Sequence, residues 1–153
     1  VSPKARADII RWTMQQDGRR VEFRYHGDGP AQALPQYRIA ALPEGYTETE
    51  RAASYAAGDV KYTNADGDMI LLSYLYMSDG VVSGFELDNG DTMTDTQVNG
   101  IPATLIVSSM EGNFSSVTWR DTASNIEFTV AAVADESVII AMAESVSLCN
   151  STN

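Results

Sequence analysis

The stretch VKYTNADGDMILLSYLYM, residues 60–77, decides the fold that this sequence predicts. Both of its ends are rich in β-branched, aromatic and aliphatic residues, and residues 64–68 between them are polar and contain a glycine. Two such runs joined by a short turn are typical of a β-hairpin. We therefore expect an antiparallel hairpin here, and we extend the prediction outward from it.

Similar runs recur along the chain, each bounded by Gly, Asn, Asp or Pro. Residues 21–25 alternate between apolar and polar side chains, which is the pattern of a half-buried strand. Short intervals between runs of this kind favour a meandering antiparallel sheet. The further runs are residues 46–51, 85–87, 97–98, 103–108, 114–120 and 126–131.

The N-terminal segment, residues 2–16, fits two patterns. Ile9 and Trp12 have helical spacing, a Ser-Pro pair resembles a helix start, and Gly18 would end a helix. Trp12 and Met14 also alternate with polar residues as they would in a strand. We favour the helix.

A second helix is predicted near the C-terminus. Asp135 is a suitable N-cap, because its carboxylate can accept hydrogen bonds from the first backbone N–H groups of a helix. Ile139, Met142, Ala143 and Val146 then recur at helical spacing and form one apolar stripe. Such a stripe is explained most simply by a helix packed on one face of the sheet.

These elements predict the α+β class, with a curved, mostly antiparallel sheet of about six to seven strands and both helices on one face. We expect a single domain over residues 1–153. Residues 1–36 supply the N-terminal helix, a strand and a loop, and residues 37–148 form the core of sheet and helix.

The chain is acidic, and its charge is unevenly distributed. Residues 1–51 carry eight of the ten Lys and Arg side chains and seven acids, a net charge of +1, whereas residues 52–153 carry two bases and 14 acids, a net charge of −12. Nucleic-acid binding depends on Lys and Arg, so this balance argues against it. No apolar run approaches the ~20 residues of a membrane-spanning helix.

Two acidic segments are candidates for Ca²⁺ binding. The first places oxygen ligands at alternate positions, as the first half of a calcium loop does, but the later bidentate Glu is missing. A turn stabilised by polar side chains explains this first segment equally well. We therefore assign no metal ligand and leave open whether these residues bind Ca²⁺: Asn64, Asp66 and Asp68, and Asp88, Asp91 and Asp95.

Catalytic chemistry has few candidate residues. His26 is the only histidine and Cys149 the only cysteine, which excludes a histidine-based zinc site and leaves one possible base for a triad. We expect His26 to be an exposed turn residue and Cys149 to lie in a frayed tail. The sequence thus assigns no catalytic residue and no cofactor-binding residue.

The order of the motifs resembles a known family. Residues 42–46, 62–70, 98–103, 117–119, 128–130 and 139–146 are similar, in order and spacing, to the domain of unknown function 4367 of Gram-positive bacteria. The likeness covers about residues 37–148. A fainter similarity runs to the C-terminal domain of periplasmic regulators that bind anti-sigma factors.

The resemblance implies a setting rather than an activity. Family members are typically extracytoplasmic, C-terminal to a single membrane-spanning helix and sometimes linked to sigma-factor regulation. The resemblance therefore implies a membrane anchor upstream of Val1. The chain opens at Val1 rather than Met, and we expect that an N-terminal part has been removed, by processing or by design.

We expect a non-catalytic sensing or protein-interaction module on the outer side of a bacterial membrane, with a protein partner of unknown identity. The alternative is a carrier that binds a lipid or peptide in an apolar pocket between sheet and helices, and the third possibility is a hydrolytic enzyme. A deep apolar cavity would favour the carrier, and a filled core with an exposed apolar or acidic patch would favour the interaction module.

Overall fold

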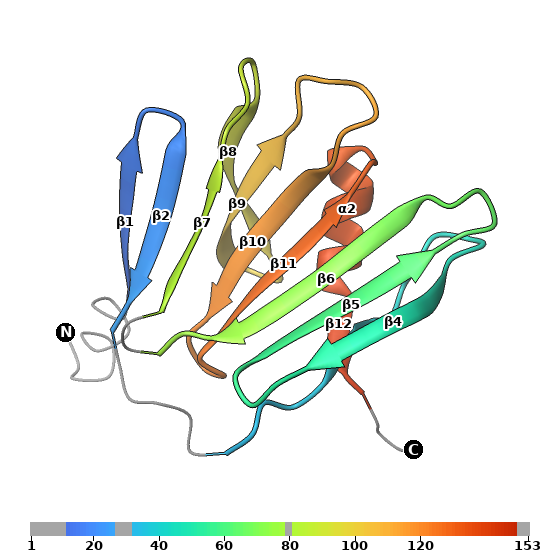
Figure 1. Ribbon diagram of the computed structural model, residues 1–153, viewed down its shortest axis with the longest axis horizontal. Helices are drawn as coiled ribbons and strands as arrows, with labels where there is room; N and C mark the ends of the chain where they lie inside the picture. The colour runs from blue at the N-terminus through green and yellow to red at the C-terminus, as the bar shows by residue number, and fades with distance from the viewer. Residues whose placement is uncertain (1–11, 27–31, 79–80, 150–153) are drawn as a thin grey trace.

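The computed structural model describes residues 12–26, 32–78 and 81–149, and the fold is dominated by one seven-stranded sheet (Figure 1). All neighbouring strands in this sheet are antiparallel. From edge to edge its order is β4 (Thr47–Ala53), β5 (Ala57–Thr63), β6 (Met69–Tyr76), β11 (Ile126–Ala132), β10 (Ser115–Asp121), β9 (Ile101–Val107) and β8 (Thr92–Val98).

The hairpin that the sequence predicts is formed by β5 and β6. Val60 is opposite Leu72 and Tyr62 is opposite Ile70, so the same face of both strands is buried. Gly67, with φ of 85°, lies in the turn between them. A left-handed backbone of this kind favours glycine, which explains the position of the turn. The prediction of this hairpin is confirmed.

Two smaller sheets complete the β-structure. The first has the order β1-β2-β7, and the second pairs β12 with β3. Their bounds are β1 (Trp12–Asp17), β2 (Arg20–Tyr25), β7 (Val82–Glu86), β3 (Tyr37–Ile39) and β12 (Val146–Leu148). The described chain thus contains more strands than the large sheet alone, whose size agrees with the expected six to seven.

The prediction of an N-terminal helix is wrong for residues 12–16, the part of it that the structure describes. Residues 2–11 lie outside the described part of the chain, and Trp12–Asp17 forms strand β1. Trp12 is opposite Tyr25 in an antiparallel pairing with β2, and Gly18, with φ of 63°, turns the chain between the two strands. Pairing with a neighbouring strand therefore decides between the two patterns that the sequence allowed.

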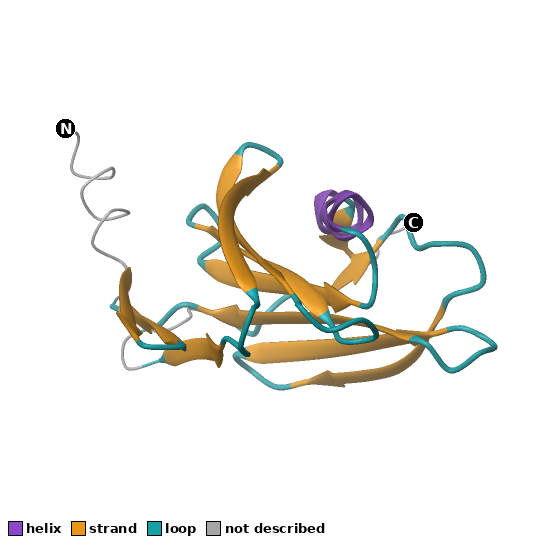
Figure 2. Cartoon of the chain, turned by 90° about the horizontal axis from the view of Figure 1, so that it is seen from above, coloured by secondary structure: helices purple, strands orange, loops and turns teal. Residues whose placement is uncertain are grey.

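The C-terminal helix α2 (Glu136–Glu144) is confirmed and lies on one side of the large sheet (Figure 2). Asp135 occupies the N-cap position, but its side chain makes no capping hydrogen bond, contrary to the prediction. Its backbone carbonyl instead accepts hydrogen bonds from the N–H groups of Val138 and Ile139, each at 3.1 Å. In the described part of the chain, no helix is long and apolar enough to cross a membrane.

The helix is also shorter than the predicted apolar stripe. Ser145 is its C-cap, and the Ser145 hydroxyl donates a hydrogen bond to the carbonyl of Met142 at 2.8 Å. Val146 follows in β12, where it is opposite Ile39. Pairing with β3 therefore ends the helix before the last residue of the stripe.

The main core fills the space between the large sheet and α2. Ile139 and Met142 on α2 are buried against strand residues that include Trp119 and Phe128. The rings of Trp119 and Phe128 are stacked, with their centroids 5.2 Å apart. Side chains of this size bury large apolar areas, and their packing is the main stabilising contribution of this layer.

A second, smaller core lies on the opposite face of the large sheet. Side chains alternate along a strand, so Leu75 on β6 points away from the face that carries Tyr74 and Tyr76. Leu75 packs against the second core, whose buried members are Val21, Phe23, Tyr25 and Met77. The β1-β2-β7 sheet therefore covers part of the face that α2 leaves uncovered.

Candidate functional site

The first candidate calcium segment is a self-contained turn. The side-chain oxygen of Asn64 accepts hydrogen bonds from the backbone N–H groups of Asp66 and Asp68, at 3.1 and 2.9 Å. Its amide donates to the Asp68 carboxylate at 3.0 Å. These bonds form a polar turn of the kind that Asn and Asp commonly stabilise.

The second candidate segment does not converge on one point. Asp88 and Asp91 lie in the turn before β8, whereas Asp95 lies within β8. The Asp91 carboxylate accepts hydrogen bonds from the backbone N–H groups of Asp88 and Ser109, both at 2.9 Å. Among the described residues, no three His, Cys, Asp or Glu side chains are grouped so that they could hold a metal ion.

The single histidine and the single cysteine lie in different parts of the fold. His26 is exposed and follows the end of β2. Cys149 follows β12, is half-buried, and its backbone N–H donates to the carbonyl of Gln36 at 2.8 Å. The prediction that Cys149 lies in a frayed tail is therefore wrong, because the pairing of β12 with β3 holds the chain up to this residue.

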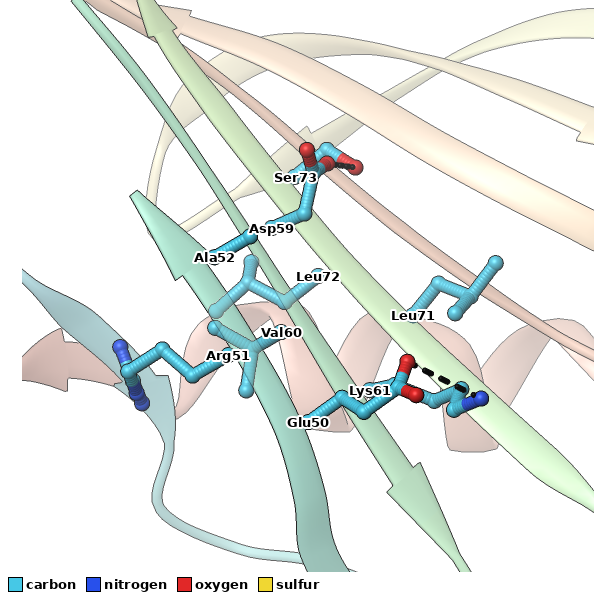
Figure 3. Close-up of a pocket in the computed structure, with 9 residues that line it drawn as sticks. All are labelled: Glu50, Arg51, Ala52, Asp59, Val60, Lys61, Leu71, Leu72 and Ser73. Atoms are coloured by element: carbon cyan, nitrogen blue, oxygen red, sulfur yellow. Dashed lines mark hydrogen bonds and ion pairs between the residues drawn. The ribbon is translucent and has the colours of Figure 1, made fainter. Parts of the chain in front are cut away.

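A hollow of about 370 Å³ lies over β4, β5 and β6 (Figure 3). Lys61 pairs with Glu50 at 3.1 Å, and Ser73 donates to Asp59 at 2.7 Å. The Arg51 guanidinium points away from the hollow, where it donates to the carbonyl of Tyr37 at 3.0 Å. The polar groups of this hollow therefore bind one another rather than converge on a ligand.

A buried ion pair joins the large sheet to the small one. Arg120 and Glu127 are directly opposite on β10 and β11, their side chains are each 5% exposed, and Nη2 lies 3.2 Å from Oε2. The Tyr25 hydroxyl donates to Glu127 and accepts from Arg120 Nε, the latter at 2.9 Å. Ser83 donates to the second Glu127 oxygen at 2.8 Å.

The ion pair of Arg120 and Glu127, with their bonds to Tyr25, holds β2 against the face of the large sheet that is opposite α2. Burial, followed by the charge of Glu127, raises the pKa of Tyr25 well above that of an ordinary tyrosine. Tyr25 therefore stays a hydrogen-bond donor throughout the neutral range. Sequence reasoning missed the cluster because both charged residues alternate with core residues along their strands, and no local pattern shows that the β1-β2-β7 sheet covers them.

The most exposed apolar groups of the described chain include several at one end of the molecule. Met110 is 60% exposed, Val133 is 52% exposed and Phe114 is 40% exposed. Figure 1 shows that the β7–β8 turn, the β9–β10 loop and the start of α2 lie together at this end. We call it the acidic end, and define it as residues 86–91, 108–114 and 133–136.

The acidic end has two hollows on either side of the β9–β10 loop. One, of about 560 Å³, is lined by residues that include Met110, Val133 and Glu136. The other, of about 390 Å³, is lined by residues that include Phe114 and Asp91. Six acids and no Lys, Arg or His line the two hollows: Glu86, Asp88, Asp91, Glu111, Asp135 and Glu136.

The β9–β10 loop is held in place by its own hydrogen bonds. Ser109 donates through its backbone N–H and its hydroxyl to the Asp91 carboxylate, at 2.9 and 3.2 Å. These bonds, with that from Asp88, lower the pKa of Asp91, which therefore stays charged. Gly90, with φ of 90°, lies so close to Ser109 that an added Cβ would be 3.0 Å from the serine Cβ.

The acidic end therefore combines negative charge, exposed apolar side chains and a fixed loop. Such a surface can bind a basic and apolar segment of another molecule through both charge and apolar contact. The acids were visible in the sequence, but their gathering depends on strand order and was not predicted.

Residues 36–146 match the family model described as "Domain of unknown function (DUF4367)". No curated protein and no solved structure matches the chain.

Proposed function

The chain belongs to the DUF4367 family, and on that premise we propose that it is a non-catalytic protein-interaction module. The observation that carries the proposal is the acidic end, where three acids line one hollow with the exposed Met110 and Val133 and three others line a second hollow with Phe114. Exposed apolar groups of this kind commonly mark interaction sites. The partner would present basic and apolar side chains to this end.

The packing of the main core supports an interaction module over a carrier. Trp119, Phe128, Ile139 and Met142 fill the space between the sheet and α2 with buried side chains. A lipid or peptide carrier would need a deep apolar cavity in that space. Three exposed apolar side chains, those of Met110, Phe114 and Val133, lie instead at the acidic end.

The proposed setting is the outer side of a bacterial membrane, with an N-terminal anchor. The family resemblance motivates this part of the proposal, together with a charge of +1 over residues 1–51 and −12 over residues 52–153. An N-terminal third that is nearly neutral can approach an anionic membrane surface with little repulsion. Labelling of the full-length protein on intact cells would test this placement, and a protein found only inside the cell would contradict it.

The interaction itself is tested with an amphipathic peptide of Leu and Lys as the probe, measured by fluorescence anisotropy. We expect the triple variant Glu111→Gln/Asp135→Asn/Glu136→Gln to bind the probe about tenfold more weakly, because contacts between charged groups are lost. The variant Phe114→Ser should also bind more weakly. A peptide in which Glu replaces each Lys should not bind.

A matched control separates the acidic end from the overall charge. The variant Asp17→Asn/Glu44→Gln/Asp66→Asn removes the same number of charges from positions outside the acidic end. It should bind the peptide nearly as well as the unmodified chain. Equal weakening in the two triple variants would show that only the net charge matters and would overturn the proposal for this surface.

A further inference from the structure

Two asparagines in the described part of the chain are each followed by a glycine, in the pairs Asn89–Gly90 and Asn99–Gly100. Asparagine is a chemically labile residue, and a following glycine favours its deamidation, because no Cβ hinders the approach of the glycine nitrogen to the asparagine side chain. Both pairs are exposed and lie in turns. The two pairs are therefore alike in sequence and in exposure, and they differ in their hydrogen bonds.

The Asn99 side chain is held by helix α2. Its Nδ2 donates a hydrogen bond at 3.1 Å to the backbone carbonyl of Glu144, one of the last carbonyls of the helix, which have no partner within it. Asn99 and Gly100 have φ of 51° and 81° and form the tight turn that joins β8 to β9. A reaction at Asn99 Cγ therefore has to break the bond to Glu144 and disturb this turn.

Asn89 is held through its backbone and not through its side chain. Its carbonyl accepts a hydrogen bond from the Ser109 hydroxyl at 2.9 Å, and the bond from the Asp91 N–H to the Asp88 carbonyl at 3.1 Å closes the turn. Among the described residues, no hydrogen bond involves the Asn89 side-chain amide. Asn89 and Gly90 are both exposed, so the side chain is free to turn toward the Gly90 nitrogen in contact with water.

We propose that Asn89 is a site of spontaneous deamidation, and that Asn99 is protected by its bond to α2. Hydroxide removes the proton of the Gly90 nitrogen, which then forms a bond to Asn89 Cγ. The bond between Cγ and Nδ2 breaks, and ammonia leaves with a proton from water, which restores the hydroxide. Water then opens the cyclic imide at either of its carbonyls and gives aspartate or isoaspartate, so water is the only reagent consumed.

Both products change the acidic end, to which position 89 belongs. Each product adds a carboxylate beside Asp88 and Asp91, so this end of the molecule becomes more negative as the chain ages. Isoaspartate also lengthens the backbone, because the chain then passes through Cβ and Cγ, and the bond from the Ser109 hydroxyl has to shift. The proposal goes beyond the proposed function, because the reaction needs no partner and is measured without one.

The test is incubation of the folded chain in mildly alkaline buffer made with heavy-oxygen water, followed by peptide mapping with mass spectrometry. Deamidation in this water incorporates the heavy isotope, which separates it from any change that preceded the incubation. We expect Asn89 to react at least about tenfold faster than Asn99, because the reaction at Asn99 requires a prior local opening of the structure. The variant Asn89→Gln should lose the reaction at position 89, because its longer side chain closes such a ring poorly, and should leave the rate at Asn99 unchanged.

The same incubation in concentrated urea is the matched control. In the unfolded chain neither asparagine is held, so Asn89 and Asn99 should react at similar rates. Three results would each overturn the proposal. Asn99 could react as fast as Asn89 in the folded chain, the ratio of the two rates could be the same in urea as in the folded chain, or Asn89 of the folded chain could show no reaction in the time that the unfolded chain reacts at both positions.

Discussion

Glu127 and Arg120 form an ion pair in which each side chain is 5% exposed, and Tyr25 and Ser83 complete the bonding of the carboxylate. Removing one partner from such a pair leaves a buried charge without compensation. We expect Glu127→Ala to lower the free energy of unfolding by about 3 kcal/mol or more. Urea unfolding of the variant measures this loss.

The double variant Arg120→Met/Glu127→Leu is the control for this prediction. Replacing a buried pair with apolar side chains of similar volume is often neutral, because no charge remains to be desolvated. The double variant should therefore be more stable than Glu127→Ala. If Glu127→Ala unfolds at the same urea concentration as the unmodified chain, the pair does not stabilise the docking of β2.

Among the elements, α2 offers a comparison between a buried and an exposed position. Met142 is buried against the main core, whereas Val138 is 38% exposed on the same helix. We expect Met142→Ala to cost about 2–5 kcal/mol, because it leaves a cavity, and Val138→Ala to cost much less. Thermal or urea unfolding of both variants measures the difference. Similar losses in the two variants would contradict the packing of α2 on the sheet.

The elements also show how much of the fold follows from sequence. The hairpin at residues 60–77 was predictable, because its alternation and its turn indicate the same structure. The strand at Trp12 was not predictable, because its sequence fits both a helical and a strand periodicity, and pairing with Tyr25 decides between them. The burial of Glu127 was not predictable, because alternation points it away from the main core, and the β1-β2-β7 sheet covers it there through Tyr25 and Ser83.

The candidate site at the acidic end could likewise not be predicted from local sequence patterns. Its acids are spread from Glu86 to Glu136 along the chain, and only the order of the strands brings them to one end. The excess of acids after residue 51 was visible in the composition. Local patterns predict elements, whereas a surface made of three loops requires the topology.

At the scale of the whole molecule, the two faces of the large sheet have cores of different size. The main core contains α2 and residues from every strand of the large sheet except β4, whereas the second core has four buried members. Regions with few buried apolar contacts open with a smaller free energy than the rest of a protein. The β1–β2 hairpin should therefore detach in a partial opening that leaves the large sheet and α2 intact.

Native-state hydrogen exchange in low concentrations of urea measures this opening. The amides of β2 should exchange with a smaller free energy and a weaker dependence on urea than those of β10 and β11, because less surface is exposed. Glu127→Ala should lower the free energy of the β2 opening directly, since Tyr25 then loses a partner that holds the hairpin on the sheet. A single common free energy for β2, β10 and β11 would mean that the two cores unfold as one unit, and that the hairpin does not open separately.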